Sequence, residues 1–253
     1  MTVSLEVIPR DLENLEKTLN AAFAYPEIGL INIPDMLRFS VRSWEGCGFI
    51  IDKMVKNPER FKMIPHIRAI DFDMNKPFPH VEFFKNKGIK EALIISGDPS
   101  EENTGYNIRE TDTPAFIKKM KREIPDIKIY AAFDPYRSNI RYELDYLKKK
   151  EEAGADGFFS QPFFDLRLIE IYAEYLEDKN VFWGISPVVS NASRNYWESR
   201  NRAIFPRSFK PDLQWNIDFG RRVLDFCRNM RFNLYIMPIR LDMDTYLAEL
   251  FPR

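Results

Sequence analysis

The sequence has few of the residues from which disulfide and metal sites are built. It contains two cysteines, Cys47 and Cys227, with no CxxC spacing, and two histidines, His66 and His80. This number of cysteines excludes a disulfide framework, and two histidines are too few for a histidine-based metal site without help from carboxylates. We therefore expect reduced thiols and no metal.

Long apolar segments and a dominant charge are also missing. No uninterrupted apolar run approaches the ~20 residues needed to cross a membrane, and the first residues, MTVSLEVIPRDLENLEK, lack the pattern of a signal peptide. Lys and Arg total 37 against 38 Asp and Glu, a net charge of -1 that gives no reason to expect nucleic acid or an anionic membrane as partner. We expect a soluble cytoplasmic protein.

Several enzyme fingerprints are absent as well. The chain has no GxGxxG, no GxxxxGK[ST], no HExxH and no GxSxG. The enzyme classes that depend on these motifs are therefore excluded.

What the sequence does contain is a regular alternation of strand-like and helix-like segments, in a chain of 253 residues with 45% hydrophobic residues. The apolar runs predict strands at 3–8, 28–33, 62–70, 91–96, 127–133, 157–159, 181–185 and 232–237. Capping residues and helical periodicity predict helices at 11–24, 43–56, 77–87, 112–123, 139–152, 166–178, 212–230 and 242–250, with Gly88 in a left-handed cap. A longer, Arg- and Asn-rich passage follows the strand 181–185 to about residue 211, and no element is assigned to it.

Eight strands joined by helical crossovers require parallel pairing, and eight strands can close a barrel whose interior is filled by side chains. No linker or change of composition divides the chain. The sequence thus predicts an α/β fold, a single-domain (β/α)8 TIM barrel over residues 1–253, with an open doubly wound sheet as the alternative.

In such a barrel the carboxyl ends of all strands face one mouth, where the functional groups gather. Polar residues on or just after the strands are therefore expected to converge there: Glu6, Asn32, Asp35, His66, Arg68, Asp98, Asp134, Gln161, Ser186 and Arg240.

Glu6 is the most informative of these, because it interrupts an apolar strand, Leu5-Glu6-Val7-Ile8. Desolvation would raise the pKa of its carboxyl group, which suits a general acid. The alternative is a structural carboxylate paired with a barrel Arg or Lys, and we favour the functional interpretation.

The other polar residues have two interpretations each. Gln161 follows the short strand Gly157-Phe158-Phe159 and could contact a substrate or only satisfy loop backbone. Asp98 follows Gly97, which permits close approach of a ligand, yet Gly-Asp-Pro is also common turn chemistry. His66 could be a ligand contact or a hydrogen-bonded core histidine, and by itself we favour the core histidine.

Together, several segments resemble the methylenetetrahydrofolate reductase family of barrel flavoenzymes. They occur in the family's order and cover nearly the whole chain: Val3-Ser4-Leu5-Glu6-Val7-Ile8-Pro9, Pro65-His66-Ile67-Arg68-Ala69-Ile70-Asp71, Ser96-Gly97-Asp98, Ala131-Ala132-Phe133, Gln161-Pro162-Phe163-Phe164-Asp165 and Gly184-Ile185-Ser186-Pro187-Val188. The resemblance implies reduction of 5,10-methylenetetrahydrofolate to 5-methyltetrahydrofolate in one-carbon metabolism, with FAD as cofactor and NAD(P)H or another donor as reductant.

The resemblance also implies roles for individual residues. Glu6 would be the general acid at folate N10, Asp98 would lie beside both the pterin and the flavin, and Gln161 and Arg240 would bind the folate. The remaining positions would contact the flavin: His66, Gly97, Phe133, Lys149 and Lys150.

The chain departs from the family pattern on the flavin side. Ser96 replaces the usual arginine, Arg137 lies in a segment without the usual histidine, and Glu143 and Tyr146 replace the usual Asp and Asn. These departures leave two alternatives: a reductase that is flavin-independent or depends on an electron-donor subunit, and a non-catalytic barrel subunit of a folate or methyl-transfer complex. A homo-oligomer is also possible, since the aromatic residues Trp197, Phe205 and Phe209 could cover the barrel or a neighbouring subunit.

Overall fold

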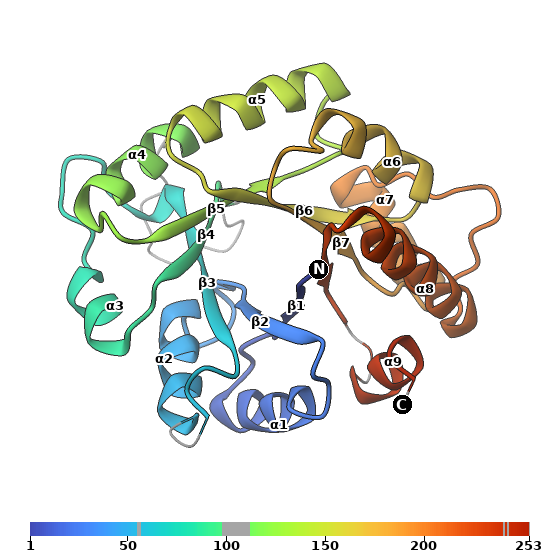
Figure 1. Cartoon of the computed structure of the whole chain (residues 1–253), viewed down its shortest axis with the longest axis horizontal. Helices are drawn as coiled ribbons and strands as arrows, with labels where there is room; N and C mark the ends of the chain where they lie inside the picture. Colours follow the sequence, from blue (N-terminus) through green and yellow to red (C-terminus); the bar gives the residue numbers. More distant parts are fainter. Residues whose placement is uncertain (55–56, 98–111, 240, 242, 253) are drawn as a thin grey trace.

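Eight parallel strands, ordered β1 to β8, pair with their neighbours, and β8 pairs with β1 to close the sheet. The computed structural model describes residues 1–54, 57–97, 112–239, 241 and 243–252. In Figure 1 the helices surround the strands, and the amino terminus lies near the centre while the carboxyl terminus lies beside α9. The predicted (β/α)8 barrel is confirmed, and closure between β1 and β8 rules out the open doubly wound sheet.

The strands are short and evenly spaced along the chain: β1 Val3–Glu6, β2 Ile28–Ile33, β3 Lys62–Arg68, β4 Glu91–Ile95, β5 Lys128–Phe133, β6 Gly157–Phe163, β7 Val181–Ile185 and β8 Asn233–Ile236. The helices are α1 Leu12–Ala22, α2 Ser43–Lys53, α3 Val81–Lys87, α4 Thr113–Glu123, α5 Ile140–Glu152, α6 Leu166–Tyr175, α7 Asn191–Asn201, α8 Leu213–Met230 and α9 Met243–Leu250, with a 3-10 turn, η1 Ala69–Asp71.

The alternation of side chains along each strand creates two separate cores. One set of buried side chains fills the barrel interior: Leu30, Ile64, Leu93, Tyr130, Phe159, Phe182, Tyr235 and Met237. The alternate strand residues pack against the helices in a larger outer core. Within the interior, the rings of Phe159 and Phe182 stack with centroids 4.2 Å apart. The barrel is therefore a packed core that closes the site from below.

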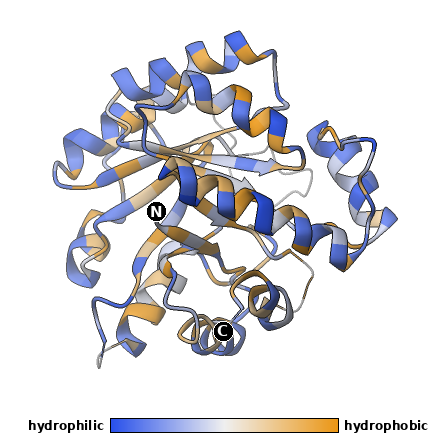
Figure 2. Cartoon of the chain, turned by 45° about the vertical axis from the view of Figure 1, so that its right-hand side comes forward, coloured by the Kyte–Doolittle hydropathy of each residue, from blue (hydrophilic) through white to orange (hydrophobic). Residues whose placement is uncertain are grey.

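Side-chain caps begin most of the helices where the sequence predicts. Asp11, Asp112, Asn139, Asp165 and Asp212 each accept a hydrogen bond from a backbone N–H of the first turn, an interaction worth about 1 kcal/mol. Gly88 ends α3 with a φ of 66°, which confirms the predicted left-handed cap. Figure 2 shows hydrophobic and hydrophilic residues alternating around the helices, as expected for helices with one buried face.

The passage 186–211, to which the sequence analysis assigned no element, contains a helix, α7, at Asn191–Asn201. Only Trp197 of this helix is buried, so the sequence shows no apolar stripe. Trp197, Phe205 and Phe209 pack in one cluster with Phe164, and the rings of Phe164 and Phe205 stack at 4.3 Å. These aromatic residues therefore cover the end of β6 within the same chain.

Strand β6 also differs from its prediction, since it continues to Phe163 instead of ending at Phe159. It contains a bulge: Phe159 pairs with Phe182 and Pro162 with Gly184, so β6 uses three residues where β7 uses two. The extra residue lies at the position of Ser160 and Gln161, and it sets the direction of the polar side chain at this strand end.

Candidate active site

Glu6 ends β1 at the carboxyl edge of the barrel, with its side chain half-buried. The hydroxyl group of Tyr235, on β8, donates a hydrogen bond to Oε2 of Glu6. Burial raises the pKa of the Glu6 carboxyl to about 7, although the hydrogen bond from Tyr235 lowers it. The partner is thus a neutral phenol, not the Arg or Lys that a structural carboxylate would need. A carboxyl group with this pKa exchanges protons near neutral pH.

A chain of neutral hydrogen bonds crosses the strands beside Glu6. Asn32 on β2 donates through Nδ2 to Oγ of Ser4 over 2.5 Å, and its Oδ1 lies 3.1 Å from Nε2 of His66 on β3. Because the Asn32 oxygen accepts, the His66 ring carries its proton on Nε2. Burial lowers the pKa of His66 to about 3, so the ring is neutral. His66 is both a buried, hydrogen-bonded histidine and part of the wall next to Glu6.

An ion network closes the loops after β2 and β3. Asp35 accepts from Nε of Arg42 over 2.9 Å and from the backbone N–H of Ser43 over 3.2 Å. Asp71 accepts from Nε of Arg68 over 3.1 Å and also contacts Arg42. Asp35 and Arg68 therefore lie near the mouth, as predicted. Their charges are paired, Asp35 with Arg42 and Arg68 with Asp71, and these ion pairs fix the loops.

The bulge of β6 places Gln161 at the surface of the mouth. Its side chain is exposed, and within the described part of the chain its amide has no hydrogen-bond partner. Gly184 makes the bulge possible, because a Cβ there would lie 2.6 Å from the carbonyl oxygen of Ser160 and 2.9 Å from that of Gln161. The Gly184 N–H donates to Oγ of Ser160 over 2.7 Å, which replaces a backbone hydrogen bond of the sheet.

Gly97 follows β4 in a left-handed conformation with φ 85°. A Cβ at this position would lie 2.9 Å from Cγ1 of Ile70 and 3.2 Å from Cβ of Arg68, so only glycine fits. Two predicted site residues, Asp98 and Arg240, lie outside the described residues.

The remaining predicted flavin contacts, Phe133, Lys149 and Lys150, lie on β5 and α5. The Phe133 ring packs in the outer core against Tyr172 and Trp183, at centroid distances of 5.4 Å and 6.0 Å. Lys149 is exposed on α5. Lys150 is 2% exposed, and its Nζ donates to the carbonyl oxygen of Ala132 over 2.5 Å. Burial lowers the pKa of Lys150 to about 8.

The polar groups on the face of α5 towards β5 have partners within the chain. Glu143 is fully buried, accepts from the backbone N–H of Asp134 over 3.1 Å and forms an ion pair with Arg137 over 2.6 Å. The ring of Tyr146 lies between two cations, 4.3 Å from Nζ of Lys150 and 5.0 Å from the Arg137 guanidinium. Tyr146 therefore covers the Lys150 ammonium group.

Tyr235 and Ser4 are the two participants that the sequence analysis did not identify. Both belong to strands that were predicted correctly in position, and strand alternation places Ser4 and Glu6 on the same face. Tyr235 could have been found only from the register between β1 and β8, in which it pairs with Ser4. That register depends on closing the barrel, so local patterns do not reveal it.

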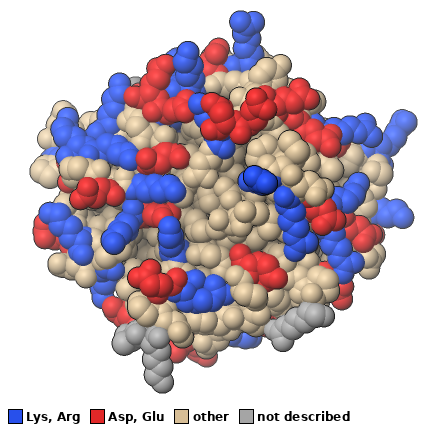
Figure 3. Space-filling view, viewed as in Figure 1, with Lys and Arg blue, Asp and Glu red and all other residues tan. Residues whose placement is uncertain are grey.

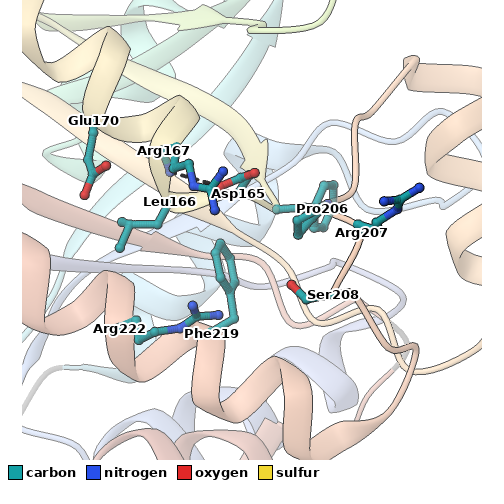
Figure 4. A pocket seen from close by; sticks show the side chains of 10 residues that line it. Asp165, Leu166, Arg167, Glu170, Pro206, Arg207, Ser208, Phe219 and Arg222 are labelled. Carbon is teal, nitrogen blue, oxygen red and sulfur yellow. Dashed lines mark hydrogen bonds between the residues drawn. The ribbon is translucent and has the colours of Figure 1, made fainter.

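A cavity of about 550 Å³ lies among the described residues (Figure 4). It is formed by the amino-terminal part of α6, the loop before α8 and α8 itself. Arg167, Arg207 and Arg222 line it together with Asp165 and Glu170, so positive and negative side chains offset each other. None of the predicted site residues lines this cavity.

Two further classes of site are absent from the part of the chain that the structure describes. No three His, Cys, Asp or Glu side chains gather closely enough to hold a metal ion. No described helix has the length and apolar character needed to span a bilayer. On the face drawn in Figure 3, basic and acidic residues are intermixed.

Comparison with known proteins identifies relatives by sequence. A family model described as methylenetetrahydrofolate reductase matches residues 2–218. The 5,10-methylenetetrahydrofolate reductase of Buchnera aphidicola subsp. Schizaphis graminum is 20% identical over 227 residues, which cover 80% of this chain and 77% of the relative. The enzyme of the same name from Buchnera aphidicola subsp. Acyrthosiphon pisum is 26% identical over 56% of this chain and 50% of its own length.

Solved structures show a likeness of fold. A 2,3-dimethylmalate lyase has a TM-score of 0.59 at 12% identity and covers 95% of this chain and 75% of its own. An oxaloacetate acetylhydrolase has a TM-score of 0.58 at 12% identity, over 98% of this chain and 79% of its own. At such identity the likeness extends to the barrel alone.

Proposed function

The chain belongs to the methylenetetrahydrofolate reductase family, and on that premise we propose that it reduces 5,10-methylenetetrahydrofolate to 5-methyltetrahydrofolate. In this reaction a proton is added to N10, the five-membered ring opens to an iminium ion, and a hydride is added to the exocyclic methylene carbon. The chain has to supply the proton, hold the folate and exclude water, while a reduced cofactor supplies the hydride.

The observation that carries the proposal is the half-buried Glu6 carboxyl with a pKa of about 7, held by Tyr235 at the barrel mouth. A general acid works best when its pKa lies near the operating pH, because a substantial fraction is then protonated. Glu6 is the residue that the family resemblance assigns to protonation of N10. Burial and the hydrogen bond from Tyr235 set its pKa, with no cation of the described residues among the causes; this supports the role, because a nearby cation would lower the pKa.

Folate binding is proposed for Gln161, with Asp98 and Arg240 as further contacts from the resemblance. The exposed, unpaired Gln161 amide supports a ligand contact, because it offers both a donor and an acceptor to a pterin edge. A loop-satisfying amide would have backbone partners, and within the described residues Gln161 has none.

FAD, which the family implies, would have to contact residues of β5 and α5. Gly97 leaves room for a ligand, but the Phe133 ring faces the outer core and the Lys150 ammonium is covered by Tyr146. Glu143 is already paired with Arg137. The α5 side of the site therefore does not fit a flavin.

This misfit favours a second candidate, a reductase of the same folate reaction that takes its hydride from a soluble nicotinamide or from an electron-donor subunit. The half-buried Glu6 and its hydrogen bond to Tyr235 speak against a third possibility, a non-catalytic barrel subunit, because a buried carboxyl group without a function only costs stability.

The experiment that tests the proposal is replacement of Glu6 by Gln. The amide keeps the shape and can accept from Tyr235, but it has no acidic proton, so formation of 5-methyltetrahydrofolate should fall by at least about 100-fold. Folate binding, measured by isothermal titration, should stay within about threefold of wild type. Full turnover in Glu6→Gln would contradict the assignment.

A further inference from the structure

Tyr235 fills part of the barrel interior and also holds its hydroxyl group against Glu6. It is 3% exposed, and its ring meets Phe159 edge-on with centroids 5.0 Å apart. Phe159 in turn stacks on Phe182. Close packing against this aromatic stack restricts the movement of the ring and holds its hydroxyl group next to Glu6.

We propose that Tyr235 is a positioning residue that binds Oε2 of Glu6 from the barrel interior and so keeps the acidic proton on Oε1, the oxygen available to the substrate. This inference rests on the proposed folate reaction. Oε1 has no hydrogen-bond partner among the described residues, whereas Oε2 accepts from the Tyr235 hydroxyl. A carboxyl group whose one oxygen already accepts a hydrogen bond places its own proton on the other oxygen.

Among the described residues around Glu6, only Tyr235 can take this role. Burial and the neighbouring carboxylate raise the pKa of Tyr235 well above its usual value, so it remains an O–H donor whenever Glu6 titrates. On β2 and β3 the nearest groups, Asn32 and His66, are uncharged. Arg68 on β3 is bound to Asp71. Among the described residues, Tyr235 is the one hydrogen-bond donor to Glu6.

The chain contains a matched control in Tyr130. Its ring also meets Phe159 edge-on, at 4.9 Å, and its hydroxyl also donates to a carboxylate, Glu91, over 3.1 Å. Glu91 begins β4 and therefore lies at the opposite end of the barrel. Replacing either tyrosine by Phe removes one interior hydroxyl and leaves the aromatic stack in place.

The test is a titration of Glu6 in the full chain, followed by the infrared band of its protonated carboxyl group and assigned with Glu6→Gln. Removing a hydrogen bond to a carboxylate should raise the pKa of Glu6 by about one to two units in Tyr235→Phe. In Tyr130→Phe it should stay at the wild-type value. An unchanged pKa in Tyr235→Phe, or an equal shift in both variants, would overturn the proposal.

A kinetic measurement separates positioning from a structural role. In Tyr235→Phe, kcat for folate reduction should fall about tenfold with KM unchanged, since the proton is no longer confined to the productive oxygen, while Tyr130→Phe keeps wild-type kcat. A rise in KM with unchanged kcat would overturn the positioning role. If wild type shows no folate reduction at all, the proposed function fails, yet the titration still decides whether Tyr235 controls Glu6.

Discussion

At the level of single residues, the absence of a side chain at Gly184 shapes the mouth as much as the polar side chains do. Gly184 has no Cβ, and this permits the carbonyl oxygens of Ser160 and Gln161 to approach within 2.6 Å and 2.9 Å of where that atom would be. The bulge in β6, and with it the orientation of Gln161, therefore depends on a residue of the neighbouring strand.

We expect Gly184→Ala to displace the bulge, because its methyl group would meet backbone atoms that cannot rotate away. The variant should lose about 1–3 kcal/mol of unfolding free energy and bind folate more weakly. Urea unfolding and folate titration measure the two effects. Gly29→Ala is the control, since its Cβ would meet only a methyl group of Thr2, at 3.5 Å. Wild-type folate affinity in Gly184→Ala would show that the bulge does not position Gln161.

Among the elements, α5 carries the departures from the pattern that the family resemblance implies, at Glu143 and Tyr146. Four of its neighbouring groups satisfy one another: Glu143 with Arg137, and Tyr146 with Lys150. The Glu143 carboxylate and the Lys150 ammonium group are therefore already engaged within the chain.

The contacts of α5 predict that the purified protein is colourless and binds FAD weakly. Tyr146→Asn should uncover the Lys150 ammonium group and increase FAD affinity by about tenfold or more, as measured by quenching of flavin fluorescence. Tyr142→Asn, on the same helix but 64% exposed, should leave the affinity unchanged. A wild-type protein that purifies with one flavin per chain would contradict this account of α5.

The elements also show what the sequence can and cannot predict. Strands β2 and β7 lie at their predicted residues because their apolar runs are bounded by turn residues, and the caps at Asp11 and Asp165 act locally. Helix α7 was missed because tertiary contacts of Trp197 stabilise it. The bulge in β6 and the hydrogen bond from Tyr235 to Glu6 were missed because both depend on how neighbouring strands pair. Glu6 itself was recognisable as a charge within an apolar strand.

For the molecule as a whole, closure of the barrel gives the Glu6 carboxyl group its raised pKa and its hydrogen-bond partner. Tyr235 lies near one end of the chain and Glu6 near the other, and the β1–β8 pairing joins them. The aromatic interior beneath them keeps water out and thereby raises the pKa of Glu6 to about 7. The acid is thus a property of the closed barrel, and we propose that it protonates N10 of the folate.

The pH dependence of kcat/KM for 5,10-methylenetetrahydrofolate tests that claim most directly. A group whose folded-state pKa is raised is protonated below that pKa, so the activity of a general acid should be full below pH about 7 and fall tenfold per unit above it. His66, with its pKa lowered to about 3, stays neutral throughout and adds no further limb. We expect a single falling limb centred near pH 7 that is absent from the residual activity of Glu6→Gln. A profile that stays flat from about pH 6 to about pH 9 would contradict it.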